Sequence, residues 1–144
     1  MKIRFRIPLL TGLVLLAFLA CGRKRPEDQV RAAFERCRAA VETGDASRAA
    51  GPLDPAFRGP EGMDRGTAQL FLMGTLRRQK VGVTVLRNEV RVDGPEATQE
   101  VDLVLTGKGG GLLPEDASRR TFLLRWRETG GQWKLLELQS QDGR

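Results

Sequence analysis

The spacing of apolar residues changes once along this chain, and that change limits the folds open to it. Between Val30 and Val41 apolar residues recur every three or four positions, which is the period of a helix. From Val81 onward they alternate with polar residues, which is the period of a strand. Helices followed by antiparallel strands predict an α+β fold, with the helices on one face of a sheet of about four strands.

The first helix has clear limits in the sequence. Pro26 is typical of a helix start, and Glu27 and Asp28 suit the first turn, where the helix dipole favours negative charge. Gly44 is expected to end it. The apolar stripe of this helix comprises Val30, Ala33, Phe34, Cys37, Ala40 and Val41. The thiol of Cys37 is therefore expected to be buried and inert, because no His is available to activate it.

Two more helices are expected before the strands. Asp45 can cap a short helix that runs to about Ala50, and Asp64 can cap a third that runs to Arg78. Apolar residues lie nearly all round the centre of the third helix, which predicts that it is substantially buried. Residues 53–60, between these two helices, are expected to be a turn-rich crossing with its leucine and phenylalanine as apolar pegs.

The strands show one irregularity. The alternation of Val81, Val83 and Val85 resumes at Val90 only after a phase slip near residues 86–88, which predicts a bulge and a bent strand. The remaining expected features are a turn at Asp93-Gly94, a strand through Val101, Leu103 and Leu105, a loop at 107–114, a strand through Phe122, Leu124 and Trp126, a turn at Gly130-Gly131 and a closing strand at 133–138. The glycines at 107–111 lack the GxxxxGK[ST] spacing of a phosphate-binding loop.

The first twenty residues differ from the rest. Residues 1–6 are basic, and residues 7–20 form an uncharged apolar stretch. Fourteen residues are fewer than the roughly 20 that a membrane-spanning helix needs, but they match the core of a signal peptide. Residues 1–20 are therefore expected to be a signal peptide, residues 21–25 a tether and residues 26–144 a single domain.

The end of that stretch, Phe18-Leu19-Ala20-Cys21-Gly22, resembles the lipobox of bacterial lipoproteins. Ala20 and Cys21 match the motif, whereas Phe18 and Leu19 depart from it. The resemblance implies cleavage between Ala20 and Cys21 and attachment of a diacylglyceryl group to Cys21. It also implies a lipid-anchored envelope protein, on the outer membrane and facing the periplasm, because Gly22 replaces the aspartate that retains enteric lipoproteins at the inner membrane. The alternatives are a plain secretory signal, giving a soluble periplasmic protein, and an uncleaved anchor.

Charge argues against a nucleic-acid partner. The net charge is +6, but six of the 24 basic residues precede Pro26, and the other 18 are matched by all 18 acidic residues. A phosphate-binding surface needs clustered surplus cations. The surplus at Arg23, Lys24 and Arg25 instead suits a tether beside lipid headgroups, or serves only to keep the tether solvated.

Few side chains for site chemistry are available. The chain has no His and no Tyr, and its two Cys, at positions 21 and 37, give neither a metal-ligand spacing nor a disulfide framework. No metal and no cofactor are expected.

The stretches "VRAAFERCRAAVETGDASRAAGPLDPAFRG" and "ETGGQWKLLELQ" resemble the opening and the closing hairpin of the nuclear-transport-factor-2-like (SnoaL-like) superfamily. The resemblance covers about residues 27–141. It implies a cone, in which a strongly curved sheet wraps around helices and leaves a pocket at its mouth. That fold hosts isomerases, cyclases and dehydratases as well as proteins without chemistry, so the fold alone does not decide function.

The enzymes of this superfamily use acids, His or Tyr in the pocket, and only acids remain here. Glu128 and Glu137 are weak catalytic candidates, for acid–base chemistry of the isomerase or dehydratase type on an apolar substrate. Gln99 shares their phase, and all three are expected to reach water at strand ends. The side chains of Glu100 and Asp102 point the other way and are expected to pair with Arg125 or Arg127. The residues that would line a pocket are Val101, Leu103, Leu124, Trp126 and Trp133, although the two tryptophans are better explained as core.

The function expected from the sequence is therefore a non-catalytic binding or scaffolding module, with the pocket enzyme as the alternative. Its expected partners are membrane lipid, through Cys21, and either an envelope protein or a small apolar ligand. A homodimer through the sheet face is a further expectation from the superfamily.

Overall fold

The computed structural model describes residues 22–108 and 119–141. The elements are α1 (Pro26–Thr43), α2 (Ala46–Ala50), β1 (Leu53–Arg58), the 3₁₀ turn η2 (Pro60–Gly62), α3 (Arg65–Arg78), β2 (Lys80–Asp93), β3 (Glu96–Lys108), β4 (Arg119–Thr129) and β5 (Gln132–Ser140). The expected signal peptide and Cys21 lie outside the described residues, as does most of the expected 107–114 loop.

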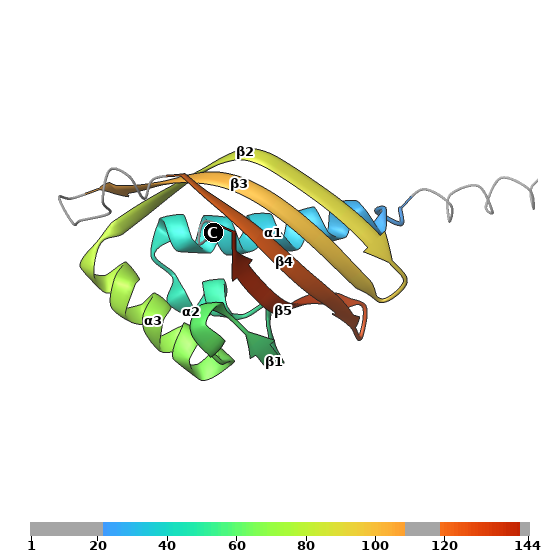
Figure 1. The fold of residues 1–144 in the computed structure, drawn as a ribbon, viewed down its shortest axis with the longest axis horizontal. Coiled ribbons are helices and arrows are strands. Elements are labelled where there is room, and N and C mark those ends of the chain that lie inside the picture. The colour runs from blue at the N-terminus through green and yellow to red at the C-terminus, as the bar shows by residue number, and fades with distance from the viewer. Residues whose placement is uncertain (1–21, 109–118, 142–144) are drawn as a thin grey trace, which may run out of the picture.

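The strands form one sheet in the order β1-β5-β4-β3-β2, in which β1 pairs with β5 in parallel and all other pairs are antiparallel. Figure 1 shows β2 and β3 arching over α1, with α2 and α3 together at the lower edge. The expected α+β architecture, with helices against a curved sheet, is confirmed, although the sheet has five strands rather than about four.

The additional strand corrects the expectation for residues 53–60. The segment Leu53–Arg58 is an edge strand, not a turn-rich crossing, and it pairs with β5 through Leu53 and Leu135. Its proline, Pro55, lacks a backbone N–H and is tolerated because the strand lies at the edge of the sheet. The two expected apolar pegs are buried, with Leu53 at 7% and Phe57 at 2% exposure.

Local signals place the helix ends where the sequence predicts them. Gly44 follows α1 in the left-handed region at φ 76°, and its N–H donates to the carbonyls at the end of the helix. The Asp45 carboxylate accepts from the N–H of Arg48 at 3.0 Å, and the Asp64 carboxylate accepts from the N–H of Thr67 at 2.8 Å. Both side chains therefore act as the predicted N-caps.

Two bulges set which side chains enter the core. The register between β2 and β3 shifts between Val85 and Arg87, as predicted, so Leu86 is left 54% exposed. A second shift, opposite Arg125 and Trp126, lets Leu135 and Leu138 both pack toward the core. The buried core comprises Val30, Ala33, Phe34, Ala50, Leu53, Phe57, Ala68, Ala97, Val101, Leu103, Leu124, Trp126, Trp133 and Leu135.

The third helix is not buried as expected. Of the α3 residues only Ala68 is buried, while Leu70 is 69% and Phe71 is 60% exposed. The helix packs against α2, β1 and β2 along one side only, because the described chain places no further element over its other side. Ala68 and Leu72 contribute to core packing, whereas Leu70 and Phe71, on the other side, do not.

Candidate functional site

The expected pocket-lining residues lie in the core. Val101, Leu103, Leu124 and Trp126 are at most 5% exposed and belong to the cluster between the sheet and the helices. Trp133 is also buried, at 7% exposure, but its ring reaches the wall of a surface pocket. That the four core residues named first also line a ligand pocket stays a prediction.

The two catalytic candidates lie outside that pocket. Glu128 is exposed near the end of β4. Glu137 is half-buried on β5, where it accepts from Gln139 and, at 2.7 Å, from Arg125. The hydrogen bond from Gln139, followed by the bond and charge of Arg125, lowers the pKa of Glu137 below its usual value.

The ion pairs on β3 differ from the expected ones. Glu100 and Asp102 pair with Arg87 of β2, not with Arg125 or Arg127. The strand register explains this, because Arg125 stands opposite Thr98 and Arg127 opposite Glu96.

The Asp102 carboxylate also accepts a hydrogen bond from a side chain of the neighbouring strand β4. It accepts from the Thr121 hydroxyl at 2.8 Å and from the Arg87 guanidinium at 3.1 Å. The Thr121 bond, followed by the Arg87 bond, lowers the pKa of Asp102, so this carboxylate remains ionised.

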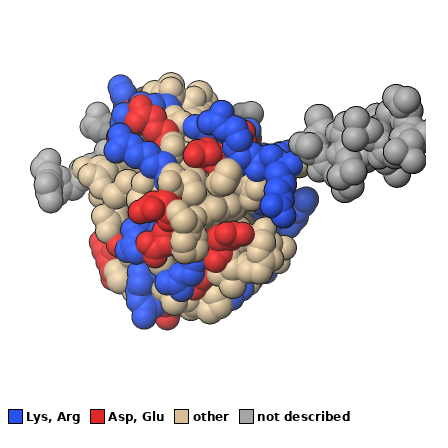
Figure 2. Space-filling model, turned by 90° about the vertical axis from the view of Figure 1, so that its right-hand side faces the viewer, with Lys and Arg blue, Asp and Glu red and all other residues tan. Residues whose placement is uncertain are grey.

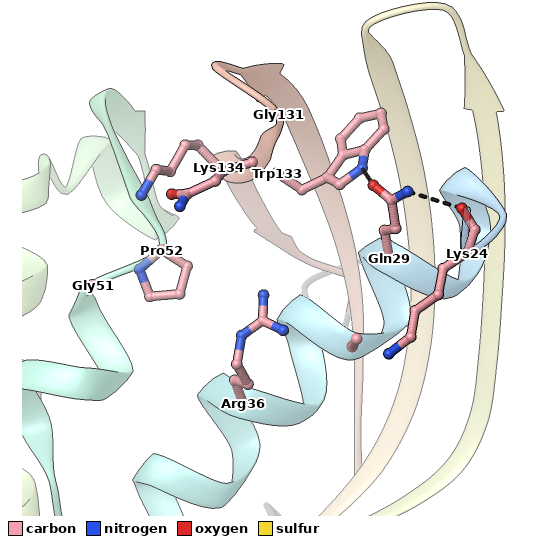
Figure 3. Close-up of a pocket in the computed structure, with 10 residues that line it drawn as sticks. Lys24, Gln29, Arg36, Gly51, Pro52, Gly131, Trp133 and Lys134 are labelled. Atoms are coloured by element: carbon pink, nitrogen blue, oxygen red, sulfur yellow. Dashed lines mark hydrogen bonds between the residues drawn. The ribbon is translucent and has the colours of Figure 1, made fainter. Parts of the chain in front are cut away.

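A pocket of about 430 Å³ opens where α1 faces the start of β5. Its walls come from the tether and α1 (Lys24, Gln29, Ala32 and Arg36), from the α2–β1 turn (Gly51 and Pro52) and from the β4–β5 turn with the start of β5 (Gly131, Gln132, Trp133 and Lys134). Figure 3 shows these walls, with the Arg36 side chain extending from α1 toward Pro52 and Lys134.

One hydrogen-bonded chain holds the wall beside α1. The indole N–H of Trp133 donates to Oε1 of Gln29 at 3.3 Å, and Nε2 of Gln29 donates to the backbone carbonyl of Lys24 at 2.9 Å. Figure 3 shows both bonds and places Gln29 between the indole ring and the tether. The start of α1 is thereby linked to β5, which lies about a hundred positions later in the chain.

The charge of the pocket has one sign. Its lining includes the cations Lys24, Arg36 and Lys134 and no Asp or Glu, and none of the three cations forms an ion pair with the described residues. Figure 2 views the side of the molecule on which α1 begins; Lys and Arg gather beside that end, while both signs mix over the rest of this face.

The sequence holds a weak signal for this pocket. Gln29, Ala32 and Arg36 recur at intervals of three and four, so they form a stripe of α1 next to its apolar stripe. Nothing in the local pattern indicates that this stripe faces the β4–β5 turn. The pocket cations were therefore not identified from the sequence.

The one thiol among the described residues, that of Cys37, is half-buried. Burial raises the pKa of the Cys37 thiol to about 11, which leaves it protonated at neutral pH, as its place on the apolar stripe predicts. Among the residues that the structure describes, no group of three or more His, Cys, Asp or Glu side chains lies close enough together to hold a metal ion. Among the described helices, none combines the length and apolar character that crossing a bilayer requires.

Comparison with known proteins identifies the fold. No protein-family model and no curated protein matches the chain. An NTF2-like protein from Cytophaga hutchinsonii superposes with a TM-score of 0.67 at 15% identity, over 81% of this chain and 98% of that one.

Two further solved structures carry names of enzymes. One is described as a candidate dehydratase of the NTF2-like family from Streptomyces avermitilis, with a TM-score of 0.67 and 18% identity over 78% of this chain and 92% of that one. The other is described as a candidate aromatic ring hydroxylase from Novosphingobium aromaticivorans, with a TM-score of 0.64 and 13% identity over 81% of this chain and 90% of that one. At these identities the likeness establishes the fold alone: the chain has the NTF2-like fold.

Proposed function

We propose that this protein is a non-catalytic binding module, held at a bacterial envelope membrane through a lipid on Cys21, whose pocket takes a small anionic ligand. The supporting observation is the pocket beside α1: among the described residues its lining has three cations and no carboxylate, and these cations form no ion pair. Its volume of about 430 Å³ falls within the usual range for small-molecule sites. The ligand expected from the sequence was apolar, and the charge of the lining changes that expectation to an anion.

Recognition in this pocket would combine charge with one aromatic surface. Arg36 can donate two parallel hydrogen bonds to a carboxylate or a phosphate, and Lys134 supplies a point charge from the opposite wall. The Gln29 side chain is already committed to Trp133 and to the tether, so it fixes the indole ring rather than the ligand.

The described carboxylates do not favour acid–base catalysis. A general acid or base works best with a pKa near the operating pH. Hydrogen bonds instead lower the pKa of Asp64, Asp102 and Glu137, which remain ionised and partnered. The alternative of a pocket enzyme draws on the names of structural neighbours, which share the fold at 18% identity or less.

The pocket and the proposed anchor would be close. Consecutive Cα atoms lie about 3.8 Å apart, so Lys24, in the pocket wall, is within roughly 11 Å of Cys21 along the backbone. An anion held there could be a free small molecule or the headgroup of a neighbouring lipid.

The anion site is tested with residues 22–144, which contain every described element. With Trp126→Phe, Trp133 is the sole tryptophan and reports on the pocket. Inorganic phosphate and glycerol 3-phosphate should each give a saturable change in its fluorescence, and Arg36→Gln and Lys134→Gln should abolish it. Arg91→Gln, which removes an exposed cation outside the pocket, is the matched control. A response of equal size in all variants would contradict the site.

The anchor is tested separately in cells. Mass spectrometry of the mature N-terminus should find a diacylglyceryl-modified cysteine at position 21, and Cys21→Ser should leave the protein unprocessed. For the rival enzyme, a double Glu128→Ala, Glu137→Ala variant that loses a cellular phenotype while keeping its fold would favour catalysis.

A further inference from the structure

We infer that the outer face of α3 docks on an anionic lipid bilayer. Leu70 and Phe71 project from this helix with 69% and 60% of their surfaces exposed, and they are neighbours. Large exposed apolar side chains that lie together mark interaction sites more often than isolated ones do. This inference goes beyond the proposed function and does not depend on lipidation of Cys21.

The helix places cations beside these apolar side chains. At 100° per residue, Leu70, Phe71, Gly74, Arg77 and Arg78 fall on one side of α3, and Ala68, Leu72 and Leu76 fall on the other. The first group is the docking face. It combines two apolar side chains at its centre with two arginines in the last turn of the helix.

Acidic residues are absent from this helix. The sequence of α3, RGTAQLFLMGTLRR, contains no Asp or Glu. Arg77 and Arg78 are exposed and form no ion pair with the described residues. The docking face is therefore positive, although residues 26–144 as a whole, these two arginines included, carry equal numbers of basic and acidic side chains.

The positive charge of the docking face distinguishes between two partners, a second copy of the chain and a lipid bilayer. A two-fold contact through the docking face would bring the arginines of two copies together, and like charges across an interface are unfavourable. A bilayer containing anionic lipid accepts both features, because Leu70 and Phe71 can enter the acyl boundary while Arg77 and Arg78 remain at the phosphates. Figure 1 shows α3 along an edge of the fold, where a flat surface can approach it.

The test is sedimentation of residues 22–144 with vesicles, so that no lipid anchor contributes. The protein should sediment with phosphatidylcholine vesicles that contain phosphatidylglycerol, and only weakly with phosphatidylcholine alone. The Leu70→Ser, Phe71→Ser double variant should bind at least roughly tenfold more weakly. The Arg77→Gln, Arg78→Gln pair should also bind several-fold more weakly, and only on the anionic vesicles.

Leu86→Ser is the matched control, because Leu86 is 54% exposed but lies on β2, away from the docking face. It should bind as the unmodified protein does. Circular dichroism checks the folding of each variant; if the serine pair does not fold, the arginine pair, which keeps both apolar side chains, carries the test.

Three results would overturn the inference: no sedimentation with anionic vesicles, equal binding by the Leu70→Ser, Phe71→Ser variant, or a dimer in light scattering that this variant dissociates. The last result would assign the face to a second copy of the chain. None of them bears on Cys21, so the proposed anchor and this face can fail independently.

Discussion

The indole N–H of Trp126 donates a hydrogen bond of 2.9 Å to Oε1 of Gln99, and both side chains are buried almost completely where β4 meets β3. Nε2 of Gln99 in turn donates to Oδ1 of Asn88 on β2, at 2.8 Å. These hydrogen bonds span three strands and give the buried side-chain polar atoms of Gln99 and Trp126 their partners. Gln99 is thus part of the core, and the expectation that it reaches water near a strand end is wrong.

Replacing Gln99 by Leu should destabilise the domain by about 1–3 kcal/mol, because the Trp126 N–H would stay buried without an acceptor. Equilibrium urea unfolding measures the change. In a Trp126→Phe background, the same replacement should cost clearly less, since that background has no indole N–H to leave unpaired. Equal costs in both backgrounds would mean that the Gln99–Trp126 bond contributes nothing.

How much of this fold the sequence predicts depends on the range of the signal. The caps at Asp45 and Asp64 and the bulge near Leu86 follow from residues within a few positions, and the structure confirms them. The strand β1 was missed because its pairing of Leu53 with Leu135 joins segments about eighty residues apart. Local composition, with a proline in the segment, indicated a turn there.

The candidate site illustrates the same limit. Arg36 and Lys134 are ordinary surface cations in the sequence, and only the packing of α1 beside the β4–β5 turn brings them to one pocket. The arginines that pair with Glu100 and Asp102, Arg87 on β2 for both and Arg119 on β4 for Asp102, do not follow from the sequence, because the register between the strands is not encoded in any one strand.

The carboxylate of Asp102 should contribute to acid stability. Hydrogen bonds from Thr121 and Arg87 lower its pKa in the folded state, so its contribution is present above about pH 4 and is lost as the pH falls through the lowered value. Asp102→Asn should therefore lower the Tm at neutral pH, and the gap to the unmodified protein should close in acid. Thermal melts between about pH 2 and 7 measure it.

Asp93→Asn is the control for that series, because Asp93 is exposed at the end of β2. Its melting curve should run parallel to that of the unmodified protein. A gap for Asp102→Asn that stays constant down to the lowest pH would show that its charge is not what stabilises the fold.

The thiol of Cys37 should be slow to react. With a pKa of about 11, it is almost entirely protonated at pH 8, whereas an exposed thiol is ionised to an appreciable extent. Residues 22–144 contain no other cysteine, so alkylation there reports on Cys37 alone. Alkylation at pH 8 should be more than roughly a hundredfold slower in buffer than in urea.

The same thiol predicts a change in alkaline stability. The folded state favours the protonated form, so the contribution of Cys37 is full below about pH 9 and declines as the pH rises toward about 11. The stability difference between the unmodified protein and Cys37→Ala should shrink over that interval. A difference that is independent of pH, together with fast alkylation in buffer, would place the thiol in solvent.

Close packing between β2 and β3 makes Gly82 sensitive to any side chain. A Cβ at this position would lie 2.5 Å from Oγ1 of Thr106, its register partner, so Gly82→Ala should destabilise the domain by about 1–3 kcal/mol. Thr106→Ala removes that oxygen, and Gly82→Ala in this background should be neutral or stabilising, since alanine restricts the unfolded chain more than glycine does. Gly74→Ala in α3, where a Cβ meets nothing within 4 Å, is the control and should stabilise. Urea unfolding of the four variants measures these changes in stability. An equal effect of Gly82→Ala with and without the Thr106 side chain would mean that the threonine rotates away from the added methyl group.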